Sequence, residues 1–373
     1  MKVVSIVGAR PQFIKAAPVS RELRWQHTEV LVHTGQHYDD AMSRRFFEDL
    51  EIPEPDADLA VGPASHAQQT ARIMERFEPV LCQQKPNVVV VVGDVNSTLA
   101  CALAAAKLGV AVAHVEAGLR SFDRRMPEEI NRVLTDAVSD FLFTTCADAN
   151  ENLLREGISP EKIFFVGNVM IDSLMKFREK SKASCIVEDL GLKRREYVLM
   201  TLHRPSNVDK VKNFRGLLEA VREIQRRLPV VFPIHPRSRK MLQELGLQDE
   251  ADQIPNLRII QPLGYVDFLR LMDLAQLVLT DSGGIQEETT VLGIPCLTLR
   301  ENTERPVTVH QGTNQVVGSD PKRITQEAIL VLEQRTRKPS RPKFWDGRAA
   351  HRIVDVLLKT MSIPGAAKTR RRE

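Results

Sequence analysis

Residues 87–118, "NVVVVVGDVNSTLACALAAAKLGVAVAHVEAG", predict a strand, a helix and a second strand in immediate succession. The runs 87–93 and 110–118 are rich in β-branched residues, whereas the alanine-rich segment 96–109 between them favours a helix. Both runs are apolar almost throughout and do not alternate, which is typical of a parallel sheet covered by helices on both faces. This stretch therefore predicts an α/β protein.

The same alternation of strand and helix runs along the whole chain of 373 residues and predicts two parallel-sheet domains. A charged stretch, 176–196, separates two sets of strands and is typical of a linker with its own helical turns. The expected strands are 2–8, 29–35, 87–93, 110–118 and 140–146 in the first set, and 197–203, 229–235, 257–262, 275–281 and 294–299 in the second.

We expect two Rossmann-like, doubly wound domains with a ligand cleft between them, since ligands of such sheets bind beyond the carboxyl ends of the strands. The first domain is predicted to span 1–170 and the second 171–345. A helix at about 346–362 is expected to pack back on the first domain, and 363–373 form a basic tail.

The composition favours a globular, soluble protein of the cytoplasm. Hydrophobic residues make up 43% of the chain, and the net charge of +4 with only 5% aromatic residues gives no indication of nucleic-acid binding. The five cysteines form no CxxC pair, and the chain has no HxH or HExxH spacing, so neither a disulfide framework nor a metal site is expected. No apolar run approaches the roughly 20 residues that cross a membrane, and the N-terminal run is too short for a signal peptide.

The segment "TDSGGIQEE", residues 280–288, predicts an anion site at the start of a helix. Two glycines in a helix cost about 1 kcal/mol each relative to alanine, so the chain must gain something from them. With Ser282 as N-cap, Gly283 and Gly284 leave backbone N–H groups open to a phosphate. Glu287 is expected to complement the helix dipole, and Glu288 to face the cleft, where it could accept from ligand hydroxyls.

A second strand–turn–helix segment, "VGARPQFIKAAP" at 7–18, lacks the GxGxxG pattern of a dinucleotide cofactor site. Arg10 and Lys15 nevertheless lie near the positive end of the helix, where cations are mildly unfavourable. An anion bound between them would explain the placement; the alternative is that both are solvated surface cations.

Three carboxylates follow strands of the first set. Asp94 and Glu116 are 22 residues apart, one βα unit, so adjacent parallel strands should bring them side by side. Glu128 lies on a loop that enters a helix. For Asp94 the alternative is an N-cap role, whereas an unpaired Glu116 at the end of an apolar strand would be costly to bury, which favours function. Glu129 is expected to favour the helix start.

His203 and His235 end the first two strands of the second set. A lone histidine at a strand end is more often a hydrogen-bonded structural residue than a catalyst, so both roles stay open for His203 and the structural one is favoured for His235.

At these residues the chain resembles the non-hydrolysing UDP-N-acetylglucosamine 2-epimerases. The motifs occur in the family's order: "GARPQFIKAAP", "TGQHYDDAMS", "GDVNSTLA", "HVEAGLRSFDRRMPEEINR", "DSGGIQEE" and "RENTERP". The resemblance implies a glycosyltransferase-B-like fold and a cytoplasmic homodimer that interconverts UDP-GlcNAc and UDP-ManNAc without NAD or metal. Such an enzyme supplies ManNAc units for cell-surface polysaccharide.

The resemblance also assigns residues. Acid and base roles map onto Asp94, Glu116 and Glu128, with His203 as a further candidate. "TGQH", with Gln36 and His37, keeps part of the region where some bacterial relatives bind a second UDP-GlcNAc, and His235 is a possible regulatory residue. The positions that match UDP contacts are Arg10, Lys15, His203, Phe268 (against the uracil), Ser282, Gly283, Gly284, Glu288 and Arg305.

Other readings stay open. Many bacterial members have "HRRE" or "HRAEN" where this chain has "HRPSN" (203–207), and several motifs also resemble epimerases of diacetamido-uronic acid nucleotides. "TERP" (303–306) favours the N-acetylglucosamine branch. A hydrolysing epimerase that releases ManNAc, or a UDP-sugar glycosyltransferase, would share the fold and the diphosphate site; a nucleotide-sugar sensor without catalysis would leave the three carboxylates unexplained.

Overall fold

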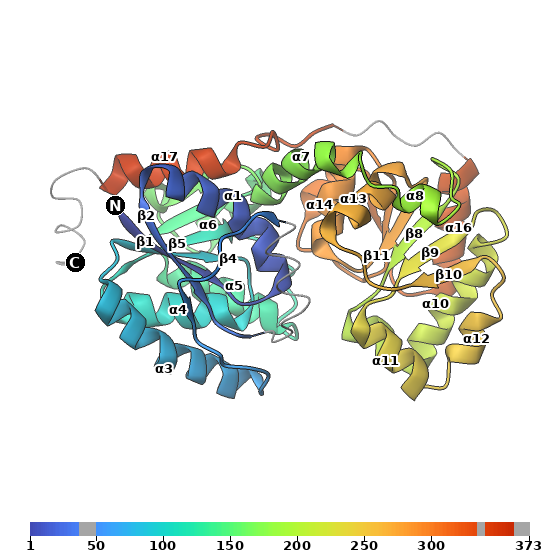
Figure 1. The fold of residues 1–373 in the computed structure, drawn as a ribbon, viewed down its shortest axis with the longest axis horizontal. Helices are drawn as coiled ribbons and strands as arrows, with labels where there is room; N and C mark the ends of the chain where they lie inside the picture. The colour runs from blue at the N-terminus through green and yellow to red at the C-terminus, as the bar shows by residue number, and fades with distance from the viewer. Residues whose placement is uncertain (37–49, 334–339, 362–373) are drawn as a thin grey trace. The chain divides into compact units, whose positions relative to one another are not determined.

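The computed structural model describes residues 1–36, 50–333 and 340–361 (Figure 1). The chain divides into two compact units: unit 1 comprises Met1–Met175 with Lys343–Glu373, and unit 2 comprises Lys176–Pro342. His37, most of the "TGQHYDDAMS" motif and the basic tail 363–373 lie outside the described residues.

Unit 1 contains a seven-stranded sheet in the order β3-β2-β1-β4-β5-β6-β7, and its strand pairs are parallel. All five strands predicted from the sequence are present; β3 and β7 have only two and three residues, too few for a periodicity to mark them. The strands are β1 (Lys2–Val7), β2 (Thr28–His33), β3 (Ala57–Asp58), β4 (Val88–Val92), β5 (Ala111–Ala117), β6 (Phe141–Thr144) and β7 (Ile163–Phe165).

Helices pack on this sheet through the valine-rich strands that the sequence marked. Side chains of β1, β2 and β4, among them Ile6, Val32 and Val91, share one buried core with Ile73 and Phe77 of α3. Helix α4 contacts α3 and α5, while α17 contacts α1 (Figure 1). The helices are α1 (Arg10–Gln26), α3 (His66–Gln84), α4 (Asn96–Lys107), α5 (Pro127–Val138), α6 (Ala147–Arg155), α7 (Val169–Ser181, which continues into unit 2) and α17 (Ala349–Met361).

The C-terminal segment belongs to unit 1. The Asp172 carboxylate accepts hydrogen bonds from the N–H groups of Ala349 (3.1 Å) and Ala350 (2.8 Å), the first residues of α17. The buried Trp345 indole donates to the carbonyl oxygen of Thr145 at 2.9 Å. These contacts fix the start of α17 on the unit that holds the N-terminal sheet.

Unit 2 contains a six-stranded sheet in the order β10-β9-β8-β11-β12-β13, again with parallel pairs. The five predicted strands are all present, and β13 is a further three-residue strand. The strands are β8 (Val198–Thr201), β9 (Val230–Pro233), β10 (Leu257–Ile260), β11 (Leu277–Thr280), β12 (Cys296–Thr298) and β13 (Asn314–Val316).

Its core joins Phe232 of β9 to Phe214 and Leu218 of α10. The charged stretch expected to be a linker contains the end of α7 and the short helix α8. The helices of this unit are α8 (Ile186–Asp189), α9 (Pro205–Val208), α10 (Val211–Ile224), α11 (Pro236–Glu244), α12 (Gln248–Asp252), α13 (Tyr265–Leu274), α14 (Gly283–Leu292), α15 (Pro306–His310) and α16 (Pro321–Glu333).

The five cysteines are free thiols. Within the described ranges, no helix combines the length and apolar character needed to cross a bilayer. Nor does that part of the chain hold a group of three or more His, Cys, Asp or Glu side chains arranged to bind a metal ion.

Candidate active site

Two of the three predicted acid and base residues of unit 1, Asp94 and Glu116, lie where strands β4 and β5 end. These strands are parallel neighbours, with Val92 in register with Val115, so the residues that follow them lie at the same edge of the sheet. Asp94 lies two residues after the end of β4, and Glu116 is the second-last residue of β5. The side-by-side placement expected from the βα spacing is therefore present in the backbone.

Glu116 adopts a backbone conformation that is rare for its residue type. Its φ of 75° is left-handed, and the pairing of β5 with β6 shifts register between Val115 and Ala117, so Glu116 forms a bulge. Such a conformation costs a non-glycine residue about 1 kcal/mol or more and is concentrated at functional sites. Its carboxylate is buried, only 4% exposed, and forms an ion pair with the Lys15 ammonium of α1.

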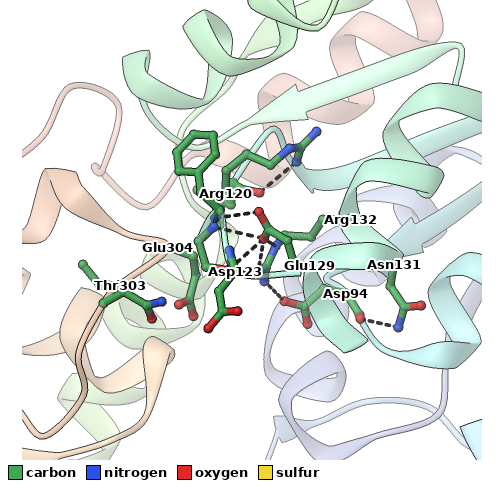
Figure 2. Close-up of polar contacts among 12 residues, drawn as sticks. Asp94, Arg120, Asp123, Glu129, Asn131, Arg132, Thr303 and Glu304 are labelled. Atoms are coloured by element: carbon green, nitrogen blue, oxygen red, sulfur yellow. Dashed lines mark hydrogen bonds and ion pairs between the residues drawn. The ribbon is translucent and has the colours of Figure 1, made fainter. Parts of the chain in front are cut away.

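Asp94 is not the N-cap of α4. That helix begins at Asn96 with Val95 at the N-cap position, so the capping alternative for Asp94 was wrong. Instead, the Asp94 carboxylate forms an ion pair with Arg132 of α5 (Figure 2). The Asn131 amide donates to the Asp94 carbonyl oxygen at 2.9 Å, which fixes the backbone of the same turn.

Glu129 does more than favour the start of α5. It is buried and accepts from the backbone N–H groups of Ser121 (3.0 Å) and Phe122 (2.8 Å) and from Arg132 Nη2 (2.6 Å) (Figure 2). Although burial raises its pKa, the hydrogen bonds from Ser121 and Arg132 lower the pKa more, which favours a carboxylate. Glu128, its neighbour, is half-buried.

Arg132 was missed by the sequence analysis, although it bridges Asp94 and Glu129 and is 2% exposed. Its spacing of three residues from Glu129 on one helix was a signal for the local pair. The contact with Asp94, 38 residues away, had no such signal.

The turn before α1 is held by Gln12, another residue that the sequence analysis missed. Gln12 Oε1 accepts from the N–H groups of Gly8 (2.8 Å) and Ala9 (3.1 Å), and its amide donates to the Val92 carbonyl oxygen at 2.8 Å. These two N–H groups are therefore used within the protein. Lys15, one of the two expected anion ligands, is 6% exposed and pairs with Glu116, so it is not a solvated surface cation; the Arg10 side chain lies outside the described part of the chain.

Gln36 is buried beside the start of α4. Its Oε1 accepts from the Ser97 N–H at 3.0 Å and from the Ser97 hydroxyl at 2.7 Å. In this structure its side chain therefore links the end of β2 to α4.

In unit 2, helix α14 begins directly after β11, as the "TDSGG" segment predicts. Ser282 occupies the N-cap position, but its hydroxyl makes no capping hydrogen bond. A Cβ on Gly283 would overlap Arg305 Nη1 and lie 2.8 Å from Glu304 Oε1. A side chain at 283 would therefore have to displace the buried Arg305, which lies against the helix start.

Arg305 is held by two carboxylates inside unit 2. Its Nε lies 2.8 Å from Glu287 Oε1, and its Nη1 pairs with Glu304. Glu304 also accepts from Arg300 at 2.7 Å; burial raises the pKa of Glu304, but Arg305 and Arg300 hold it well below its usual value. The expected role of Glu287, complementing the helix dipole, is therefore incomplete because Glu287 fixes an arginine.

Glu288 is 3% exposed and accepts from the Tyr265 hydroxyl at 2.7 Å. Burial raises the pKa of Glu288 to about 7. A ligand hydroxyl would have to share this carboxyl group with Tyr265. Phe268 is half-buried on the same helix, α13.

His203 and His235 lie close together after β8 and β9, with ring centroids 5.7 Å apart. His203 Nδ1 lies 2.8 Å from the buried Asp281 carboxylate, and Asp281 also accepts from the backbone N–H groups of His203 and Arg204. His235 is the N-cap of α11, where Nδ1 accepts from the Arg237 N–H at 3.2 Å. His235 thus has the structural role that was favoured for it.

Comparison with known proteins places the chain among nucleotide-sugar 2-epimerases. The model of the family described as UDP-N-acetylglucosamine 2-epimerase matches residues 21–358. The UDP-N-acetylglucosamine 2-epimerase of Methanocaldococcus jannaschii is 44% identical over 369 residues, which cover 96% of this chain and 99% of the relative. The UDP-2,3-diacetamido-2,3-dideoxy-D-glucuronate 2-epimerase of Pseudomonas aeruginosa is also 44% identical, over 365 residues that cover 96% and 100%.

Solved structures agree with the sequence comparison. The M. jannaschii UDP-GlcNAc 2-epimerase in complex with UDP-GlcNAc and UDP superposes with a TM-score of 0.90 at 43% identity, covering 96% of this chain and all of the other. The Neisseria meningitidis enzyme bound to UDP-GlcNAc gives a TM-score of 0.87 at 33% identity, with the same coverage.

Proposed function

Because the chain belongs to the UDP-N-acetylglucosamine 2-epimerase family, we propose that it interconverts UDP-GlcNAc and UDP-ManNAc without hydrolysing them. The observation that carries the proposal is the pair of carboxylates at adjacent strand ends, Asp94 and Glu116, each paired with a buried cation. Carboxylates held in this way are suited to stabilising positive charge on a sugar and to moving a proton.

The reaction requires more than direct proton abstraction. The C2 proton of a hexose has no neighbouring carbonyl group, so it becomes acidic only if the C1–O bond to UDP breaks. Elimination of UDP leaves a 2-acetamidoglucal, and UDP adds back after a proton returns to the opposite face of C2. Because the proton leaves one face of C2 and returns to the other, the reaction needs more than one acid or base group. Asp94, Glu116 and Glu128 are the candidates, with His203 as a further one.

We assign the diphosphate to the start of α14 and to the cations around it. The Ser282, Gly283 and Gly284 backbone lies at the positive end of that helix, where an anion is stabilised. Arg305 packs against Gly283 and would stabilise the charge that develops on departing UDP. Arg10 and Lys15 of unit 1 complete the assignment. Phe268 would contact the uracil and Glu288 a hydroxyl group.

A second candidate substrate is a UDP-diacetamido-uronic acid, because the P. aeruginosa enzyme named for such a substrate is as similar to this chain as the M. jannaschii enzyme. Proton NMR of the purified protein with each nucleotide sugar separates the two. We expect new UDP-ManNAc signals from UDP-GlcNAc, with deuterium at C2 when the reaction is run in heavy water.

Other outcomes of that experiment would overturn the proposal. Free ManNAc would identify a hydrolysing enzyme. Conversion of the diacetamido-uronic acid nucleotide alone would establish the second candidate. No change in either sugar until an acceptor is added would point to a glycosyltransferase, and retention of the original C2 proton would exclude the two-face scheme.

We also propose that the enzyme works as a cytoplasmic homodimer, as the family resemblance implies. Helix α5 supports this assembly because Ile130, Val133 and Leu134, at helical spacing on one face, are 41%, 39% and 46% exposed. Asn131, Arg132 and Asp136, on the other face, are buried within unit 1.

A further inference from the structure

A buried histidine–aspartate contact lies next to the turns that carry Asp94 and Glu116. His114 of β5 and Asp136 of α5 are 0% and 1% exposed. His114 Nδ1 lies 2.6 Å from Asp136 Oδ1, and His114 Nε2 lies 2.8 Å from the carbonyl oxygen of Gly93. One side chain therefore joins strand β5 to α5 and to the residue immediately before Asp94.

The other Asp136 oxygen contacts residues that follow Glu116 in the chain. Asp136 Oδ2 accepts from the Gly118 N–H at 3.1 Å and from Arg120 Nη2 at 2.7 Å. Gly93, Glu116 and Gly118 all have left-handed φ values, of 71°, 75° and 78°. Glycine adopts this conformation without strain, but for Glu116 it persists only when surrounding contacts hold it. The His114–Asp136 pair is placed to maintain the turns on both sides of Glu116.

The geometry fixes the number of protons on His114. The Gly93 carbonyl oxygen can only accept, so Nε2 must carry a hydrogen. Asp136 Oδ2 accepts from the Gly118 N–H and pairs with the Arg120 guanidinium, which favours the carboxylate form of Asp136, so its Oδ1 also accepts. Nδ1 therefore carries the second hydrogen, which makes His114 an imidazolium.

We propose that His114 is a positioning residue that holds the Asp94 and Glu116 turns in place as a doubly protonated imidazolium. Its catalytic consequence rests on the epimerase activity proposed above, whereas its protonation does not. Loss of either proton would remove one of the two hydrogen bonds. At alkaline pH we therefore expect the Asp94 turn to separate from β5 or Asp136 to lose its partner.

Several charged groups lie around His114. Asp136 faces it from α5, and Arg120 reaches the same carboxylate from the loop that follows β5. Arg120 is itself neutralised by Glu156, with contacts of 2.8 and 2.6 Å. Beyond Gly93 lies the Lys15–Glu116 pair, in which the two charges offset each other.

Side-chain nitrogen NMR of histidine-labelled protein tests the protonation directly. We expect both His114 nitrogens to show the shifts of an imidazolium at about pH 8, because each nitrogen faces an acceptor oxygen. The His114→Phe variant assigns the signals. A neutral tautomer of His114 at that pH would overturn the proposal whether or not the protein is an epimerase.

Kinetics test the positioning role. His114→Phe keeps a ring of similar size without donors, and we expect kcat to fall by about 10- to 100-fold with little change in KM, since a small displacement of a catalytic group has an effect of this size. His351→Phe, on the surface, is the matched control and should behave as the wild type. A folded His114→Phe protein with wild-type kcat would refute the role.

Asp136→Asn separates hydrogen bonding from charge. Its amide can donate to an unprotonated Nδ1 while its oxygen still accepts from Gly118 and Arg120, so a neutral His114 keeps its bond to Gly93. We expect a smaller fall in kcat than in His114→Phe, loss of the imidazolium signal and a weaker decline of kcat at alkaline pH. A loss equal to that of His114→Phe, with the alkaline decline unchanged, would contradict the assigned protonation.

Discussion

At the scale of single residues, the site is defined by side chains whose charge is balanced inside the protein. Glu116 combines a left-handed backbone, burial and an ion pair with Lys15. The sequence argument identified Glu116 from the cost of burying a carboxylate at a strand end. It could not identify the partner, because Lys15 is 101 positions away and only the strand order brings α1 beside β5.

Glu116→Gln is predicted to abolish most of the turnover. The amide keeps the shape and much of the hydrogen bonding but removes the charge and the proton affinity, so epimerisation should fall by about 100- to 10,000-fold. Calorimetric titration should show that UDP still binds, because most of the proposed diphosphate contacts lie in unit 2 and the substitution leaves Lys15 in place. Glu151→Gln, an exposed carboxyl on α6, is the control. Near wild-type turnover in Glu116→Gln would assign Glu116 a structural role.

Two glycines of α14 provide a matched pair of substitutions. Gly283→Ala would place a Cβ against Arg305 and Glu304, so we expect UDP affinity to fall at least 10-fold in a folded protein. Gly293, at the other end, has a φ of 71° and open space around it. Gly293→Ala should reduce stability by about 1 kcal/mol and leave UDP affinity unchanged. Equal UDP affinities in the two variants would contradict the proposed phosphate site.

Glu288 makes stability depend on pH. Burial raises its pKa from 4.5 to about 7, so the folded protein holds this proton more tightly than the unfolded chain. The stabilisation is fully present below about pH 4.5 and is lost as pH rises to about 7, by an amount on the order of 3 kcal/mol. In urea denaturation, the wild type should lose stability relative to Glu288→Gln over this range. Glu75→Gln, exposed on α3, is the control substitution. A pH-independent difference for Glu288→Gln would count against the raised pKa.

At the scale of elements, the sequence predicted what depends on local pattern. The ends of ten strands were predicted to within two residues, because apolar runs rich in β-branched residues mark buried parallel strands. The helix starts at Pro11 and Ser282 were visible from proline and glycine chemistry. Strands β3, β7 and β13 were missed because two or three residues carry no periodicity. The contacts of Arg132 with Asp94 and of His114 with Asp136 were missed because they join different elements.

The contact between α7 and α17 gives a prediction at this scale. Asp172→Ala removes the acceptor for the first two N–H groups of α17, so we expect the free energy of unfolding to fall by about 1–2 kcal/mol. Asp172→Asn keeps an acceptor and should lose less. Asp355→Ala, a surface carboxylate within α17, is the control in the same urea titration. Equal stability of Asp172→Ala and Asp355→Ala would show that the cap contributes little.

At the scale of the whole molecule, the two-unit organisation follows from the two sets of strands. The chain passes from one unit to the other within α7, between Met175 and Lys176, and returns to the first unit at Lys343. Repeated βα units could be read from one sequence. The assembly of several chains could not, because an exposed apolar face and a buried one have the same helical spacing until the fold shows which face is covered.

Helix α5 ties the proposed homodimer to the proposed site. Arg132 pairs with Asp94 on one face, and Ile130, Val133 and Leu134 are exposed on the other. Leu134→Glu places a charge in the middle of that apolar face, where burial without a partner is costly, so we expect the dimer to dissociate. Light scattering after size-exclusion chromatography should give the mass of one chain, about 42 kDa, in place of two.

Leu154→Glu is the matched control, since Leu154 is 48% exposed on α6, away from the α5 face. It should leave the dimer intact. If α5 is stabilised by the partner, Leu134→Glu should also lower kcat, because the same helix fixes Asp94 through Arg132 and holds Glu128. A Leu134→Glu protein that remains a dimer would place the interface elsewhere. A monomer with full activity would separate assembly from catalysis, and the positions of Asp94 and Glu128 would then depend on the contacts within unit 1 alone.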